Sequence, residues 1–144
     1  YINWFFNKIN FVYAQLYNGG ELGIDVEESA DLILKNHMGY NIYVHLSFNS
    51  LFSSRKCSIV GSKGILEWDL IKKTIFYKLV DGEEKIEYFE FERDDLFKNQ
   101  INHFFYCVEN GTKPIVSIDD GVNALKLVEA SKSSNLQNKA IYLK

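Results

Sequence analysis

Histidine side chains are the first candidates for chemistry in this sequence, because their ordinary pKa lies close to neutral pH. The three histidines are His37, His45 and His103. His37 falls in a predicted turn, and His103 falls beside the apolar stripe of a predicted helix, so both are expected to be ordinary solvated or packed side chains. His45 alternates with Tyr43 and Ser47 on the polar face of a predicted strand. That face could line a binding cleft, form a subunit interface or meet water, and we take Tyr43 and His45 as binding-site candidates.

Arg55 is the best candidate for binding an anion. A guanidinium group at the entry of a predicted hairpin can form paired hydrogen bonds with a phosphate or a carboxylate group. The alternative is a surface ion pair with one of the 19 acidic residues of the chain.

The stretch Gly61–Gly64, which reads GSKG, also suggests phosphate chemistry. A phosphate-binding loop lies between a strand and a helix whose first amides face the anion. Here the residues that follow, Ile65–Leu70, alternate in polarity and predict a strand. The glycines are also too close together for a nucleotide-binding pattern. We therefore predict a tight β-hairpin turn at these glycines.

Neither a metal site nor a nucleophilic triad is indicated. His103 and Cys107 are four residues apart on a predicted helix and could reach one ion, but two ligands are too few for a zinc site. Cys57 and Cys107 are the only cysteines of the chain. We expect both to be reduced, which is the usual state of cysteine in the cytoplasm, the expected location.

Period-two alternation predicts the strands that would position these residues. The hairpin of Ser29–Lys35 and Asn41–Asn49 turns at Asn36 and Gly39, and a further meander turns at Asp81-Gly82. The predicted strands are Asn10–Tyr17, Ser29–Lys35, Asn41–Asn49, Cys57–Val60, Ile65–Leu70, Lys73–Leu79, Lys85–Phe91 and Lys139–Leu143. Glutamates around the strand at Lys85–Phe91 would form the wet face of a sheet edge.

Two helices are predicted near the C-terminus. The first carries an apolar stripe from Phe97 to Val108, with Asp94 or Asp95 as its N-cap and Gly111 as its stop. The second begins with the capping box Ser117–Asp120. We expect it to turn Val122, Leu125 and Val128 inward and to end near Ser133–Asn135.

The composition is that of a globular domain. Of the 144 residues, 47% are hydrophobic and 15% aromatic, and the formal net charge is −3. A weakly acidic chain does not favour nucleic-acid binding, which requires a basic face. No apolar run is long enough to span a membrane.

Several motifs together resemble one enzyme family. The stretches RKCSIVGSKGILEWDL (Arg55–Leu70) and ERDDLFKNQINHFFYCVENGTKPIVSIDDGVNALKLVEASKSS (Glu92–Ser134) resemble the C-terminal domain of Gfo/Idh/MocA-type oxidoreductases. Glycine, Trp-Asp, His-Phe, Glu-Asn-Gly and Asp-Gly elements stand in the order typical of that family, and Gly23–Leu34 resembles its strand entry. The branch linked to surface-polysaccharide and amino-sugar biosynthesis is the most similar.

The resemblance implies a longer parent protein in which an N-terminal Rossmann domain binds NAD or NADP. The C-terminal sheet would then wall part of a sugar site and form subunit contacts. This chain lacks the family's Glu-Lys-Pro lysine and its Asp-x-x-x-His segment, so we expect the fragment alone to bind no cofactor and to be inactive. Asn3 stands where the family usually has aspartate. An amide cannot act as a base, but it can hydrogen-bond a sugar hydroxyl.

These observations predict a single α+β domain over residues 1–144. It would be an open, mostly antiparallel sheet of roughly six to nine strands with two C-terminal helices packed on one face. The expected ligand is a sugar or sugar nucleotide contacted by Arg55, Asn3, His45 and Tyr43, and the expected partner is a second copy docked through the sheet face. The alternative is a free-standing β-rich binding or oligomerisation module without enzymatic activity.

Overall fold

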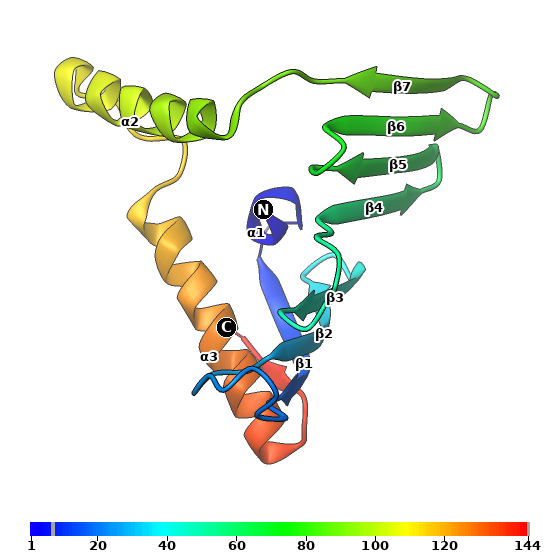
Figure 1. Cartoon of the computed structure of the whole chain (residues 1–144), viewed down its shortest axis with the longest axis vertical. Coiled ribbons are helices and arrows are strands. Elements are labelled where there is room, and N and C mark those ends of the chain that lie inside the picture. The colour runs from blue at the N-terminus through cyan, green and yellow to red at the C-terminus, as the bar shows by residue number, and fades with distance from the viewer. Residues whose placement is uncertain (7, 144) are drawn as a thin grey trace. The chain divides into compact units, whose positions relative to one another are not determined.

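The computed structural model describes residues 1–6 and 8–143 as an α+β fold (Figure 1). The chain divides into two compact units, a first unit of Tyr1–Ser50 with Lys113–Lys144 and a second unit of Leu51–Thr112. The eight strands of the described residues lie within the predicted range and form two four-stranded antiparallel sheets. The elements are α1 (Ile2–Phe6), β1 (Ile9–Tyr17), β2 (Ser29–Asn36), β3 (Asn41–Ser47), β4 (Lys56–Gly61), β5 (Gly64–Asp69), β6 (Thr74–Leu79), β7 (Glu84–Tyr88), α2 (Arg93–Asn110), α3 (Ile118–Gln137) and β8 (Ile141–Tyr142).

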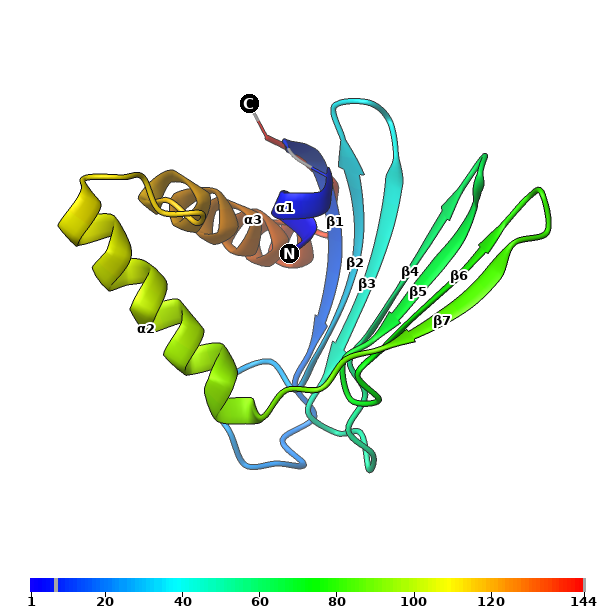
Figure 2. The ribbon, with the colours of Figure 1, turned by 90° about the horizontal axis from the view of Figure 1, so that it is seen from above.

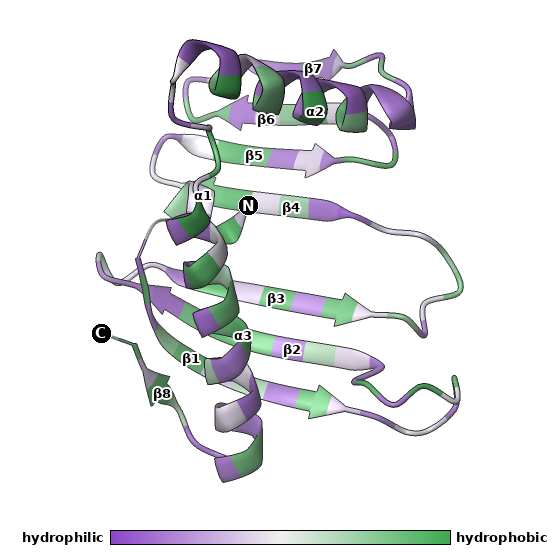
Figure 3. Cartoon of the chain, turned by 90° about the vertical axis from the view of Figure 1, so that its left-hand side faces the viewer, coloured by the Kyte–Doolittle hydropathy of each residue, from purple (hydrophilic) through white to green (hydrophobic). Residues whose placement is uncertain are grey.

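The sheet of the first unit has the strand order β3-β2-β1-β8, and the predicted β2–β3 hairpin is confirmed. Asn36 shapes its turn, because its Oδ1 accepts the N–H groups of Met38 at 3.1 Å and Tyr40 at 2.9 Å. Gly39 supplies the positive φ of 86° that this turn requires. Figure 3 shows the alternation of hydrophobic and hydrophilic residues along β3, which was the sequence signal for this strand.

The core of the first unit lies between one face of this sheet and α3, which runs across that face (Figure 2). Val12, Ala14 and Leu34 are fully buried there, and Ala130 packs against them from the helix. Alternation along the strands sends the intervening side chains to the opposite face. We call that opposite face the outer face; it carries Tyr13, Gln15, Asp31, Ile33, Tyr43 and His45.

The predicted inward face of α3 is wrong. Val122, Leu125 and Val128 are exposed, whereas Ala130, Ser131 and Ser134 are buried and Leu127 is half-buried. The capping box is confirmed, because the Ser117 side chain accepts the Asp120 N–H and the Asp120 side chain accepts the Ser117 N–H. The helix also continues past the predicted stop, to Gln137, and ends at Asn138 in the left-handed conformation.

Polar side chains in the last turns of α3 face the sheet and accompany the continuation of the helix past the predicted stop, because they satisfy the edge of β1. β8 pairs with β1 only at Phe11 and Val12. Farther along β1, Ser134 Oγ accepts the Ala14 N–H at 3.0 Å, and Asn135 Oδ1 accepts the Leu16 N–H at 2.9 Å. A buried backbone N–H needs a partner, so small polar residues face the sheet here.

The sheet of the second unit has the order β4-β5-β6-β7, as the predicted meander requires. Gly61 pairs with Gly64 across the β4–β5 hairpin, so a strand follows the glycines and no phosphate-binding loop is present at them. A Cβ on Gly64 would collide with the Lys78 carbonyl oxygen and lie 3.0 Å from the Leu79 Cα. Gly64 therefore allows β6 to pass close to the backbone, where a side chain would not fit.

Asp69 of the Trp-Asp pair has a structural task in the same sheet. Its Oδ1 accepts the N–H groups of Ile71 and Lys72, both at 3.0 Å, and Lys56 Nζ lies 3.6 Å from its Oδ2. These contacts, led by the Lys72 amide, lower the pKa of Asp69. The aspartate thus holds the β5–β6 turn.

Helix α2 ends as predicted at Gly111, which has a left-handed φ of 61°. The predicted N-cap is wrong, because Glu92 takes that position and Asp95 closes a capping box from N3. The apolar stripe exists as a pattern, but Phe97, Phe104 and the rest of it are exposed. β7 lies at the edge of the sheet, as expected for the glutamate-rich segment.

Among the described residues, no helix is both long and apolar enough to cross a bilayer.

Candidate functional site

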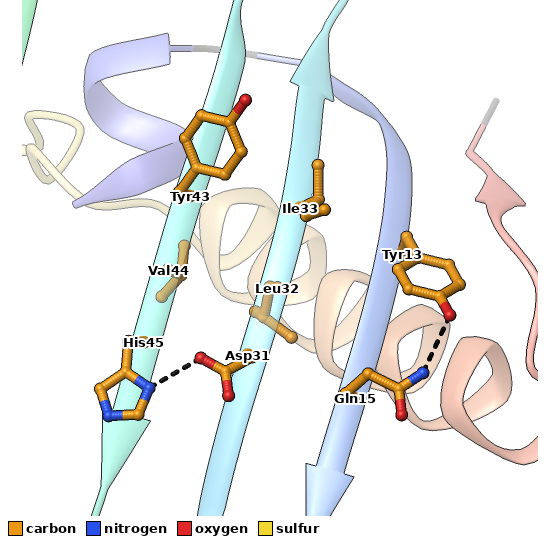
Figure 4. A pocket seen from close by; sticks show the side chains of 8 residues that line it. All are labelled: Tyr13, Gln15, Asp31, Leu32, Ile33, Tyr43, Val44 and His45. Atoms are coloured by element: carbon orange, nitrogen blue, oxygen red, sulfur yellow. Dashed lines mark hydrogen bonds and ion pairs between the residues drawn. The ribbon is translucent and has the colours of Figure 1, made fainter.

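The outer face of the first sheet bears a shallow hollow of about 350 Å³ across β1, β2 and β3 (Figure 4). Strand alternation places its polar groups, because Tyr43 and His45 on β3 lie two residues apart and point to the same side. The hollow contains both residues that the sequence singled out on this strand. The lining residues are Tyr13, Gln15, Asp31, Leu32, Ile33, Tyr43, Val44 and His45.

His45 is oriented by a carboxylate from the neighbouring strand. Asp31 and His45 are register partners in the β2–β3 hairpin, and Asp31 Oδ1 lies 2.7 Å from His45 Nδ1. The contact fixes the imidazole plane and directs the Nε2 edge away from the carboxylate. Both side chains are about two-thirds exposed, at 67% and 64%. A contact so exposed to water contributes little stability, so its effect is mainly to orient the ring.

A second set of hydrogen bonds joins the opposite side of the hollow to α3. Gln15 Nε2 donates to Tyr13 Oη at 2.9 Å, and Tyr13 Oη donates to Asn138 Oδ1 at 3.2 Å. The Tyr13 ring is thereby held on the outer face by Asn138, the residue that directly follows α3. Asn138 has a left-handed φ of 47°, which brings its side chain back to the strand.

Taken together, these groups can bind a polar, uncharged ligand with apolar faces. Asp31 and Gln15 offer acceptors, His45 and Gln15 offer donors, and Tyr43 presents a ring that is 75% exposed. Sugars have this character, with hydroxyl groups around apolar C–H faces that stack on aromatic rings. The same composition also suits a protein interface, where tyrosine is enriched.

The remaining two predicted site residues lie elsewhere. Asn3 is a half-buried residue of α1 in the first unit. Arg55 belongs to the second unit, is exposed and directly precedes β4, where its carbonyl oxygen accepts the Leu70 N–H at 2.9 Å. The structure therefore brings Tyr43 and His45 together on one face, and it places Asn3 and Arg55 on other elements.

The residues that could hold a metal form no cluster. Within residues 1–6 and 8–143, no three side chains of His, Cys, Asp or Glu gather at one point. Cys107 Sγ lies 3.5 Å from His103 Nε2, as their helical spacing implied. Both cysteines are free thiols, and burial raises the pKa of Cys57.

Sequence reasoning missed two acidic residues. Asp31 could have been found, because the turn at Asn36 and Gly39 sets a register that pairs it with His45. Glu28 could not, because it precedes β2 in a polar stretch with no sign of burial, yet its side chain is fully buried. Its carboxylate accepts backbone N–H groups of the β1–β2 loop.

Comparison with known proteins gives the fold. No family model matches the chain, and no curated protein matches it. Solved structures do match. Levoglucosan dehydrogenase in complex with NADH and levoglucosan aligns with 99% of the chain at a TM-score of 0.89 and 12% identity, and aldose-aldose oxidoreductase from Caulobacter crescentus, complexed with glycerol, aligns with 94% at a TM-score of 0.81 and 20% identity.

A third match extends the range of ligands seen with this fold. The WlbA dehydrogenase from Bordetella pertussis, in complex with NADH and UDP-GlcNAcA, aligns with 99% of the chain at a TM-score of 0.76 and 15% identity. The chain spans 47%, 42% and 44% of the length of these three structures. These matches confirm the α+β fold that the resemblance to Gfo/Idh/MocA-type C-terminal domains predicted.

Proposed function

We propose that this chain is the C-terminal, substrate-binding domain of a Gfo/Idh/MocA-type oxidoreductase that acts on a sugar with NAD or NADP. The observation that carries the proposal is the structural match over 99% of the chain to a dehydrogenase that holds both NADH and a sugar. The ordered sequence motifs between Arg55 and Ser134 support the same family independently of the fold.

The proposal divides the reaction between two parts of the protein. When bound, the nicotinamide accepts the hydride from the sugar carbon, and a base takes the hydroxyl proton. Gly61 and Gly64, the glycines that suggested phosphate chemistry, close a β-hairpin, so we assign no cofactor contact to this chain. Its own residues bind and orient the sugar. Tyr43 stacks on a C–H face, His45 and Asn3 hydrogen-bond hydroxyls, and Arg55 binds an acidic or phosphorylated group where the sugar carries one.

The outer face would also serve assembly. Its residues Gln15, Asp31, Tyr43 and His45 are exposed, and an exposed sheet face of this composition suits docking of a second copy. Tyr43 and His45 cannot contact a sugar and a partner with the same atoms. The two roles can therefore be separated by experiment.

The decisive test of the function is an assay on the whole natural reading frame that encodes the chain. The purified product is screened for reduction of NAD and NADP with neutral sugars, sugar acids and nucleotide sugars. Reduction with at least one class supports the proposal. A reading frame with no strand–GxGxxG–helix region, whose product binds neither cofactor by calorimetry, leaves the free-standing module as the function.

Variants of the outer face then separate substrate binding from assembly. Tyr43→Ala and His45→Ala are expected to raise KM about tenfold each while kcat changes less, since each removes one contact to the substrate. Tyr40→Ala, at an exposed tyrosine of the β2–β3 turn, is the matched control. Unchanged KM together with dissociation in light scattering would assign both residues to the subunit interface instead.

A further inference from the structure

Glu28 is the one acidic or basic side chain that is buried among the residues the structure describes. It directly precedes β2 and has a relative exposure of 0%. Acidic side chains are almost never fully buried without partners, because removing a charge from water is costly. The partners of Glu28 therefore indicate what the residue does.

Those partners are backbone amides of the loop that joins β1 to β2. Oε2 accepts the Gly19 N–H at 3.1 Å, and Oε1 accepts the Leu22 N–H at 2.8 Å. Asn49, just beyond β3, donates from Nδ2 to Oε2 at 3.4 Å. A single carboxylate thus links two points of the loop to the far end of the hairpin.

The backbone of Glu28 extends the same connection. Its N–H donates to the Tyr17 carbonyl at the end of β1 at 2.8 Å, and its carbonyl accepts the Phe48 N–H at 2.9 Å. Main chain and side chain together tie the ends of β1 and β3 and the loop between β1 and β2 to one residue.

The other hydrogen bonds of the loop are local ones, made by the Asn18 side chain and between Gly20 and Gly23. Gly20 and Gly23 have positive φ values of 75° and 62°, which are conformations that glycine leaves readily. Leu22 and Val26 are exposed, at 45% and 54%, so burial of apolar side chains holds little of the loop in place. Asn18 contributes local bonds, from Nδ2 to the carbonyls of Ile24 and Val26.

We propose that the ionised carboxylate of Glu28 is the anchor of the β1–β2 loop, and that the loop is a strap which opens when this charge is removed. Hydrogen bonds to a charged acceptor are stronger than neutral ones, and two of them end on the same side chain. The strap fixes the exposed Leu22 and Val26 at the end of the sheet only while Glu28 is charged.

The electrostatic setting agrees with this role. The Leu22 amide first, and then the amides of Gly19 and Glu21 and the Asn49 side chain, lower the pKa of Glu28 against the opposing effect of burial. The charged residues of the loop are Glu21, Asp25 and Glu27, and β3 ends in the uncharged Ser47, Phe48 and Asn49. Because the pKa is lowered on folding, the anchor is complete above the ordinary glutamate pKa and is lost as pH falls through the folded value.

Amide hydrogen exchange on the chain carrying Glu28→Gln tests the proposal. Glutamine keeps one acceptor oxygen but turns an NH₂ group toward the other amide. The Gly19 and Leu22 amides are expected to exchange about 10 to 100 times faster, while amides in the centre of the β1–β2 ladder change little. Glu21→Gln removes the same charge from an exposed position of the same loop and is the matched control. Unchanged exchange in Glu28→Gln, or an equal effect in Glu21→Gln, would overturn the proposal.

A second measurement on the unaltered chain covers the case in which the variant does not fold. The amide chemical shifts of Gly19 and Leu22 are followed by NMR as pH is lowered. Both are expected to titrate together, with a midpoint below that of an ordinary glutamate, as the strap opens. Amides that show no common titration before global unfolding would refute the anchor.

Discussion

Removing the Ser134 hydroxyl should loosen α3 from the sheet that carries the outer face. Ser134 is completely buried, and its Oγ makes two hydrogen bonds, accepting the Ala14 N–H at 3.0 Å and donating to the Lys139 carbonyl at 2.7 Å. Ser134→Ala deletes both bonds and leaves the backbone in place. The substitution removes one oxygen atom, so the cavity it creates is small.

The size of the destabilisation depends on whether each former hydrogen-bond partner of Ser134 can bond to water instead. Ala14 is fully buried, so its N–H cannot bond to water instead. Losing the hydrogen bond from this N–H to Ser134 Oγ therefore costs about 1–3 kcal/mol. Lys139 is exposed, so its carbonyl can bond to water at a cost of about 0–1 kcal/mol. Alanine is the better helix former and returns about 0.5 kcal/mol. The net destabilisation of the first unit should be about 2 kcal/mol.

Urea denaturation followed by tryptophan fluorescence measures this difference. The two tryptophans lie in different units, Trp4 in the first and Trp68 in the second. In a Trp68→Phe background the remaining signal reports on the first unit. Ser133→Ala, at the preceding and partly exposed position of α3, is the control and should be neutral or slightly stabilising. The reasoning fails if Ser134→Ala and Ser133→Ala have the same free energy of unfolding within about 0.5 kcal/mol.

Two further predictions concern the turns and caps. Gly64→Ala should destabilise the second unit by about 2 kcal/mol or more, because its Cβ would meet the Lys78 carbonyl. Gly82→Ala, at a positive φ with open space around it, should cost only about 1 kcal/mol. Both variants are measured by Trp68 fluorescence in a Trp4→Phe background, and equal costs would remove the steric explanation. Ser117→Ala should cost about 1 kcal/mol of unfolding free energy, as the loss of an N-cap. The Ser117 side chain and then its amide lower the pKa of Asp120, so this cap is present above the ordinary aspartate pKa and weakens as pH falls through the folded value. Helical circular dichroism should show a low-pH decrease that Asp120→Asn abolishes.

Strands and hairpins were predictable because their signals are local. Alternation and the turn residues at Gly39 and Gly82 lie within a few positions of the hydrogen bonds they determine. The N-cap of α2 was misplaced for a related reason. Three acidic residues compete near its start, and Asp95 performs its task from N3 by accepting the Glu92 N–H. Position within the first turn, rather than residue type, distinguishes a cap from its partner.

The candidate site was predictable only where one strand contains it. Tyr43 and His45 share a face because they are two residues apart, and no tertiary information is needed for that. The pairing of Asp31 with His45 follows from the register of one hairpin, and the turn determines that register. Asn3 and Arg55 belong to elements that no local pattern relates to β3. Their grouping with Tyr43 in one site remains a prediction, derived from the resemblance to a family.

The inward face of α3 shows why an apolar stripe can mislead. Choosing Val122, Leu125 and Val128 assumes that a helix packs on a sheet to bury hydrocarbon. Against the uncovered edge of β1, the stronger requirement is to satisfy the N–H groups of Ala14 and Leu16, since a buried unpaired amide costs as much as a lost methylene contact or more. Serine and asparagine are short enough to reach those amides at helix-to-sheet packing distance. A run of small polar residues late in a helix, next in sequence to a short edge strand, therefore indicates a helix that continues the strand's hydrogen bonding rather than a helix that stops.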